Sequence, residues 1–235
     1  ILFSKNSVSF RVGRAMTYIP RKLRDVFFGS KITNVPRTSG AYEAKLQKTD
    51  KNGAKLIVKN GYPLVSIVMP LYNVSAYIKK CLDSLLKQTY DRIEIICVDD
   101  GSDDDTCEIV SKYAEKYENI SLYKQQHLFA GVARNTGFEH VKGKYTVFLD
   151  SDDYFEPDFI RSLLVRAEGA RADITVCRCR GFDNSTNVNI DMKWSVHDQY
   201  LPRKCVFSGR DLGEYVFLAF MGWAWDKMYS TDFIR

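Results

Sequence analysis

Three carboxylates within four consecutive residues are the feature of this sequence most suited to chemistry. Asp150, Asp152 and Asp153 directly follow residues 145–149, an apolar, β-branched and aromatic run typical of a buried strand. Carboxylates this close repel one another unless a cation or hydrogen-bond donors compensate them. Hard oxygen ligands suit Mg²⁺ or Mn²⁺. The cluster therefore favours a divalent metal site, although acidic strand ends are also typical of solvated turns and helix caps.

A second acidic pair, Asp99 and Asp100, follows the apolar run 93–98. Parallel strands end at one edge of their sheet, and ligands bind in the crevice beyond those ends. A metal and a separate carboxylate together suit a nucleoside diphosphate, because the carboxylate accepts hydrogen bonds from a nucleobase N–H or a ribose hydroxyl. No glycine-rich phosphate loop follows any expected strand. The metal would therefore have to hold the phosphates.

The elements that must position these carboxylates are strands alternating with helices from residue 64 onwards. Strands are expected at 64–69, 93–98, 120–123 and 145–149. Helices are expected after the cap residue Ser75, after a capping box at Ser102 and Asp105, and over residues 131–141. This alternation predicts an α/β fold with a doubly wound, mostly parallel sheet.

Charge divides the chain unevenly. The 235 residues carry a net charge of +5, but residues 1–63 hold 13 Lys and Arg against 3 Asp and Glu, and residues 64–235 hold 21 against 26. The front is therefore +10 and the remainder −5. An acidic body argues against general nucleic-acid binding, so an anionic partner of the basic segment is expected to be a membrane surface or an acidic neighbour.

The basic segment is expected to be an extension and linker to one main domain over residues 64–235. Residues 9–28 interleave cations with apolar side chains, which favours an amphipathic basic helix interrupted by Pro20. Such a helix either packs on protein or lies on a membrane surface. The six cysteines lack paired CxxC spacing, as expected of reduced thiols in a cytoplasmic protein. A peripheral location at the inner face of the membrane is the alternative that the basic segment leaves open.

Four sequence blocks, in order, carry a resemblance to a known family. They are residues 65–73 (VSIVMPLYN), 98–102 (VDDGS), 130–137 (AGVARNTG) and 148–153 (FLDSDD). Together they resemble the signature of family-2 glycosyltransferases with the GT-A fold. The resemblance implies an inverting transfer of a sugar from a nucleoside diphosphate donor, most often a UDP-sugar, with Mg²⁺ or Mn²⁺. The implied acceptor is a hydroxyl of a glycan or lipid-linked molecule in polysaccharide or glycoconjugate synthesis.

The resemblance also assigns donor-side roles to individual residues. Pro70 and Tyr72 would open the uridine pocket, and Asp100 would read the uracil, with Asp99 beside it. The other residues that the resemblance places near the donor are Arg134, Asn135, Asp150 and Ser151.

The FLDSDD block contains the DxD motif of the family. Asp152 would be the direct metal ligand, and Asp150 a contact to the ribose or to a metal-bound water. Asp153 would orient the neighbouring groups. The donor half is thus expected over about 64–155 and the acceptor half over about 156–235.

The catalytic base of the family is an acidic residue beyond a Trp-x-Lys-x-Tyr-like segment, which residues 225–229 (WDKMY) resemble. The base is therefore expected beyond Arg235, with the chain truncated at its C-terminus, and Asp226 is the weaker substitute within it. Upstream, residues 209–225 are expected to form a core helix, and 183–207 a polar excursion or hairpin. His127 and His197 are expected to be surface or loop residues.

Two other classes of protein remain open from sequence. A non-catalytic nucleotide-sugar-binding module would share the donor residues and lack the base. A sugar nucleotidyltransferase would share the sheet and the metal, but should carry a glycine-rich loop where Pro70 to Asn73 stand. Continuation of the sequence into a Glu-Asp pair would distinguish the first of these from a transferase.

Overall fold

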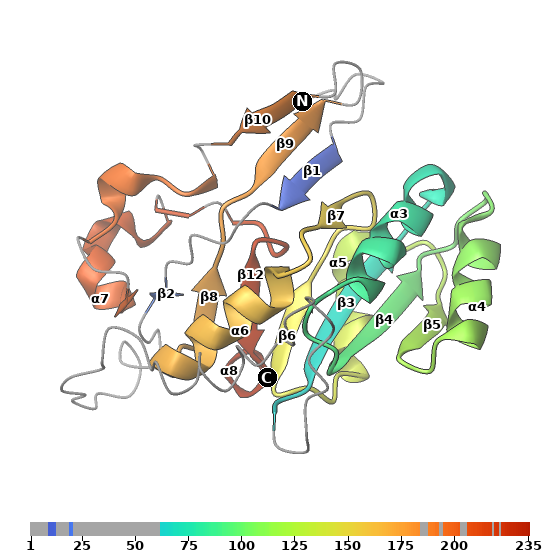
Figure 1. Cartoon of the computed structure of the whole chain (residues 1–235), viewed down its shortest axis with the longest axis horizontal. Coiled ribbons are helices and arrows are strands. Elements are labelled where there is room, and N and C mark those ends of the chain that lie inside the picture. The colour runs from blue at the N-terminus through green and yellow to red at the C-terminus, as the bar shows by residue number, and fades with distance from the viewer. Residues whose placement is uncertain are drawn as a thin grey trace, which may run out of the picture.

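The computed structural model describes residues 9–12, 19–20, 62–183, 188–192, 195–202, 206–217, 219–220 and 222–235. Its centre is a six-stranded sheet in the order β5-β4-β3-β6-β12-β8 (Figure 1). The strands are β3 (Val65–Leu71), β4 (Ile93–Asp99), β5 (Ile120–Lys124), β6 (Tyr145–Phe148), β8 (Ile174–Val176) and β12 (Lys227–Ser230). β12 runs antiparallel to both of its neighbours, whereas β3 to β6 pair in parallel. The expected mostly parallel sheet is confirmed.

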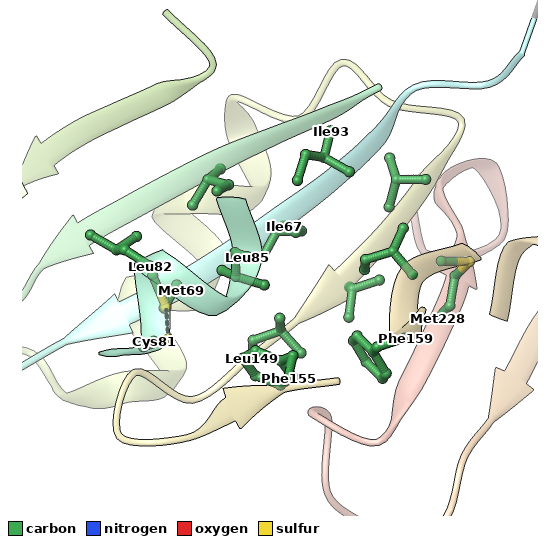
Figure 2. Close-up of a cluster of buried hydrophobic side chains, with 14 of the residues drawn as sticks. Ile67, Met69, Cys81, Leu82, Leu85, Ile93, Leu149, Phe155, Phe159 and Met228 are labelled. Carbon is green, nitrogen blue, oxygen red and sulfur yellow. Dashed lines mark hydrogen bonds between the residues drawn. The ribbon is translucent and has the colours of Figure 1, made fainter. Parts of the chain in front are cut away.

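Four helices cover the two faces of this sheet. They are α3 (Ser75–Leu86), α4 (Thr106–Lys116), α5 (Phe129–Glu139) and α6 (Phe159–Ala170). The apolar faces of α3 and α6 join Ile67 and Met69 of β3 in the main core cluster, part of which Figure 2 shows. Val68 of β3 points to the other face and packs with Ala133 of α5. Because both faces are covered, the strand is apolar along nearly its whole length.

A glycine lets α5 approach the sheet closely. A Cβ added at Gly137 would lie 2.5 Å from Val68 Cγ1 and 3.1 Å from Val98 Cγ2, closer than packed atoms tolerate. The helix can therefore rest directly on β3 and β4. Arg134 lies almost one helical turn before Gly137, so this contact helps to set the position of its side chain over the sheet edge.

The cap of α3 comes from another part of the chain. Ser75 begins the helix but makes no side-chain cap, and its own N–H donates to Asp104 Oδ2 at 3.0 Å. The preceding N–H, of Val74, donates to Thr106 Oγ1 at 2.8 Å. The expected Ser102 capping box is also absent, because α4 begins at Thr106 and Ser102 instead donates to Asp99. The loop before α4 thus satisfies the open N–H groups of α3.

Two smaller sheets accompany the central one. One has the order β10-β9-β1-β7 and the other pairs β11 with β2. Their strands are β1 (Ser9–Val12), β2 (Ile19–Pro20), β7 (Tyr154–Phe155), β9 (Arg180–Asp183), β10 (Val188–Asp191) and β11 (Val206–Phe207). β9 and β10 pair in antiparallel fashion, which confirms a hairpin at the start of the 183–207 stretch.

The predicted basic helix over residues 9–28 is wrong for the two parts of that segment that the structure describes. Residues 9–12 and 19–20 are strands, and β1 pairs with both β7 and β9. Polar Ser9 and Arg11 alternate with apolar Phe10 and Val12, and this period of two suits a strand. The rest of residues 9–28 lies outside the described residues, as does all of 21–61.

The predicted core helix over residues 209–225 is also wrong. The structure has a four-residue helix α7 (Gly209–Leu212), then a 3₁₀ turn η3 (Gly213–Phe217), and β12 begins at Lys227. Gly213 has a φ of +56°, outside the α-helical range, so the first helix ends there. The remaining short helices are η2 (Asp198–Tyr200) and α8 (Thr231–Ile234). No helix in the described part of the chain is long and apolar enough to cross a membrane.

Candidate functional site

A cavity of about 330 Å³ opens at the edge of the sheet where β3, β4 and β6 end. Its walls come from the ends of these strands, from the loop before α5 and from the first turns of α5. The lining residues are Pro70, Leu71, Tyr72, Val74, Asp100, His127, Phe129, Ala130, Arg134, Asp150, Ser151 and Asp152. Parallel strands whose connections lie on both faces of a sheet leave such a crevice at their carboxyl ends.

Asp100 is the buried carboxylate of this cavity, with 1% of its surface exposed. Its Oδ1 accepts hydrogen bonds from Gln125 Nε2 at 2.7 Å and from the Leu128 N–H at 2.9 Å. Burial alone would raise the pKa of Asp100, but these hydrogen bonds and the nearby His127 hold it below its ordinary value. Asp100 is therefore an ionised acceptor fixed in orientation.

The second oxygen of Asp100 makes no aligned hydrogen bond within the described structure, although it is buried. His127 Nδ1 lies 2.9 Å from this Oδ2, and also 3.1 Å from the Asp100 carbonyl oxygen. A buried carboxylate oxygen without a well-aligned donor is an energetically open position. It is suited to an N–H or O–H group that enters the cavity.

Tyr72 and His127 form an aromatic wall. Their ring centroids are 4.1 Å apart with an interplanar angle of 27°, and the Phe129 ring lies 4.8 Å from His127 on a tilt. Tyr72 is 43% exposed, so an aromatic surface faces solvent at the cavity. His127 does lie in a loop, as expected, but its role as a lining residue was not predicted. The available signal was its position just after the end of β5 and just before α5.

The acidic turn after β6 lies across the same cavity. Arg134 Nη2 donates to Asp150 Oδ1 at 2.6 Å, so the arginine engages a carboxylate of the site. Asp152 is exposed at the cavity, yet partial desolvation and then the charge of Asp150 raise its pKa. Asp153 is buried beneath the turn and does not line the cavity. Of the two outward carboxylates, Asp150 is thus paired with Arg134, whereas Asp152 faces the cavity next to the negative charge of Asp150.

This donor set fits a divalent cation that is shared with a ligand. No group of three His, Cys, Asp or Glu side chains converges as a complete metal site in the described ranges. Mg²⁺ and Mn²⁺ commonly bind through one or two carboxylates and take their other ligands from water and phosphate. Asp150 and Asp152 supply that number, and a cation between them would offset the charge of Asp150, which adds to the effect of burial in raising the pKa of Asp152.

Two of the predicted donor-side residues lie away from the cavity. Asp99 is buried and its Oδ1 accepts from Ser102 Oγ at 2.5 Å, so it organises the turn after β4. Asn135 is exposed on α5 and does not line the cavity, whereas its neighbour Arg134 does. The structure brings the other predicted residues, Pro70, Tyr72, Asp100, Asp150, Ser151 and Asp152, together on one cavity.

Asp226 lies behind this site rather than in it. The antiparallel pairing of Met228 with Val147 places the start of β12 beside the end of β6. Asp226 is fully buried and pairs with Lys227, whose Nζ also donates to the Trp223 carbonyl at 2.6 Å. Burial raises the pKa of Asp226 to about 6, although the Lys227 charge works in the opposite direction.

Comparison with known proteins identifies the family of this chain. The model of glycosyl transferase family 2 matches residues 66–218. The chain belongs to the family-2 glycosyltransferases, and with the parallel sheet this confirms the predicted GT-A type of α/β fold.

Individual relatives match parts of larger proteins. The putative glycosyltransferase EpsH of Bacillus subtilis (strain 168) is 33% identical over 177 residues, which are 74% of this chain and 48% of EpsH. Chondroitin synthase of Escherichia coli is 37% identical over 129 residues, 55% of this chain and 18% of that protein. The crystal structure of S. aureus TarS 1-349 in complex with UDP-GlcNAc has 30% identity and a TM-score of 0.45, covering 47% of this chain and 33% of TarS. The chain thus spans about half the length of EpsH and less of the other two.

Proposed function

We propose that this chain carries the donor site of an inverting, metal-dependent glycosyltransferase that uses a UDP-sugar. The observation that carries the proposal is one cavity with a buried nucleobase acceptor at one side and two repelling carboxylates at the other. These two sides of the cavity suit the base and the phosphates, which are the two ends of a nucleoside diphosphate. Family membership supports the same class of reaction.

The nucleoside end is assigned to Tyr72 and Asp100. The exposed ring of Tyr72 supplies a face for a planar base, and base–aromatic stacking is worth about 1–3 kcal/mol. Asp100 Oδ2 would accept the N3–H of uracil, because Oδ1 is already occupied. Pro70 and Leu71 border the same end of the cavity. A cytosine ring offers no N–H at the equivalent position, so the carboxylate favours uracil over cytosine.

The diphosphate end is assigned to the turn after β6 and to Arg134. Asp152 and Asp150 would hold Mg²⁺ or Mn²⁺, which supplies charge stabilisation to the leaving diphosphate. Arg134 fixes Asp150 through the 2.6 Å contact and adds a positive charge at the same end of the cavity. Ser151, which lies between the two carboxylates in sequence, is buried at the cavity.

The base that accepts the proton of the acceptor hydroxyl is left unassigned. Asp226 is fully buried, is paired with Lys227 and does not line the cavity. We therefore propose a supporting role for it behind the DxD turn. The acceptor is proposed to be a hydroxyl of a glycan or a lipid-linked molecule, and the similarity to chondroitin synthase favours a growing polysaccharide.

We place the reaction in the cytoplasm, with peripheral contact to the inner face of a membrane through residues 9–28. The charge of +10 on residues 1–63 supports attraction to anionic lipid. Sedimentation with vesicles should show binding when phosphatidylserine is present and loss of binding at high salt. Equal binding to neutral vesicles would contradict this placement.

Calorimetric titration tests the donor assignment. UDP, CDP and GDP are each added to the whole chain with and without Mn²⁺. We expect UDP to bind most tightly and to gain affinity with the metal. Equal affinities for the three nucleotides, or no effect of Mn²⁺, would overturn the assignment. Release of UDP from a UDP-sugar in the presence of acceptor then separates a transferase from a non-catalytic binding module.

A further inference from the structure

His127 lies against both of the groups that the proposed site offers to a nucleobase, although its Nδ1 also lies 3.1 Å from the Asp100 carbonyl oxygen. Its ring stacks on Tyr72 with the centroids 4.1 Å apart, and its Nδ1 lies 2.9 Å from Asp100 Oδ2. Imidazole and uracil share the chemistry that these groups recognise, because each is a flat ring that carries an N–H at its edge. The side chain therefore lies where a bound base would stack and donate.

We propose that His127 is an internal stand-in for the nucleobase, which an entering uridine displaces and which protonation holds in place. The inference rests on the proposed donor site and adds a means of regulating it. The nucleotide then competes with a residue of the chain itself for Tyr72 and Asp100. Affinity for the nucleoside depends on how strongly His127 holds these two groups.

The surroundings of His127 allow it to leave without dismantling the pocket. Its side chain is 39% exposed and belongs to the loop before α5. When it leaves, Asp100 Oδ1 keeps its hydrogen bonds from Gln125 and Leu128, so the carboxylate stays in position. Tyr72 likewise remains anchored by the strand end before it. Displacement thus exposes a preformed aromatic face and a preformed acceptor.

The charges around His127 determine how its competition with a nucleoside depends on pH. Asp100 faces it directly from the end of β4, while Tyr72 and Phe129, which contact its ring, are neutral. Arg134, Asp150 and Asp152 lie across the same cavity, and the first two already pair with each other. A protonated ring is attracted more strongly to ionised Asp100 than a neutral ring, so nucleoside binding weakens as the pH falls.

Uridine without metal is the probe, because it has no phosphate that titrates in this range. Binding to the whole chain is followed by NMR from pH 8 to pH 5.5. We expect wild-type affinity to fall several-fold towards pH 5.5. His127→Ala should bind uridine roughly three- to tenfold more tightly than wild type at pH 5.5, the size expected from removing one aromatic contact, with little pH dependence. The control His140→Ala removes a histidine stacked on Tyr123 at 3.8 Å and should behave as wild type.

A second variant separates the ring from its proton. His127→Phe keeps a ring that can cover Tyr72 but cannot pair with Asp100, so its uridine binding should not vary with pH. Weaker uridine binding by His127→Ala would overturn the proposal, because His127 would then be a wall of the occupied site. Persistent pH dependence in His127→Phe would also overturn it. If wild type fails to bind UDP with Mn²⁺, the proposed function itself falls, whereas UDP binding with unchanged affinity in His127→Ala removes this inference alone.

Discussion

The proposed donor half and the proposed acceptor half of this chain are built in different ways. Over residues 62–155, β3 and β4 are seven residues long and pair in unbroken register, and each helix packs close to the strands that flank it. Over residues 156–235 the strands have two to four residues, and β12 reaches the central sheet between β6 and β8 from the far end of the sequence. Local units therefore form the cavity at the ends of β3, β4 and β6, while pairings between distant parts of the sequence form the structure beside it.

The substitution Asp152→Ala should produce the largest loss of binding affinity, and the loss should be confined to metal-dependent binding of UDP. The side chain is exposed, so Asp152→Ala should leave the fold intact. We expect the gain in UDP affinity that Mn²⁺ confers to disappear, a loss of about 100-fold or more, since even changes around a metal site cost 10–100-fold. Calorimetry with and without Mn²⁺ measures it.

Uridine binding by the same variant is its internal control. Asp152 lies at the diphosphate end, so metal-free affinity for uridine should match wild type. Retained Mn²⁺ enhancement of UDP binding in Asp152→Ala would be inconsistent with its role as metal ligand. A loss of uridine binding would instead indicate damage to the whole cavity.

Two glycines on α5 test how far the donor half depends on close packing. Gly137→Ala places a methyl group 2.5 Å from Val68 Cγ1, whereas nothing lies within 4 Å of a Cβ at Gly131. We expect Gly137→Ala to destabilise the fold by about 1–3 kcal/mol. Gly131→Ala should be neutral or stabilising by up to about 1 kcal/mol, through helix propensity. Urea unfolding of both variants gives the comparison.

The same two glycine variants also test whether the packing of α5 affects UDP binding. If Gly137→Ala lifts α5 from the sheet, Arg134 moves with the helix and its contact to Asp150 weakens. UDP binding with Mn²⁺ should then fall in Gly137→Ala and stay unchanged in Gly131→Ala. Equal stability of the two variants would show that the sheet yields to the added methyl group.

Much of the donor half could be predicted because its signals are local. A buried strand ends directly in an acidic residue at Asp100 and at Asp150, and parallel strands bring such ends together whatever else the chain does. Asp99 was expected beside the donor but does not line the cavity, because adjacent residues on a strand point to opposite sides. His127 lines the cavity but was not predicted to, because only the fold brings its loop against Tyr72 and Asp100.

The acceptor half was harder to predict because its stability comes from partners distant in sequence. The apolar run 216–225 has the composition of a core helix, but Gly213 ends the helix before it, Gly222 interrupts the run, and the chain returns to the sheet as β12. The basic segment gave a similar error, since β1 exists by pairing with β7 and β9. In both segments the arrangement of apolar residues favoured a helix, and the strand depends on pairing with residues that are distant in sequence.

The place where the two halves meet can be tested through Asp226, with the smallest expected effect. Its folded pKa of about 6 lies above the ordinary value near 3.9, so between about pH 4 and pH 6 the native state holds the proton more firmly than the unfolded state. The free energy of unfolding contributed by this group therefore falls as the pH rises through that window, by about 1–3 kcal/mol in total.

Asp226→Asn should reduce the decrease in unfolding free energy with rising pH, because the amide does not titrate. The substitution also deprives Lys227 of its charged partner, which changes the unfolding free energy by a similar amount at every pH. Asp232→Asn, at an exposed acid of α8, is the control and should keep the wild-type slope. Urea unfolding at pH 4.5, 5.5 and 6.5 separates the slope from the constant shift. A wild-type slope in Asp226→Asn would mean that the carboxylate is ionised throughout, stabilised by Lys227 strongly enough to offset its burial beside the end of β6.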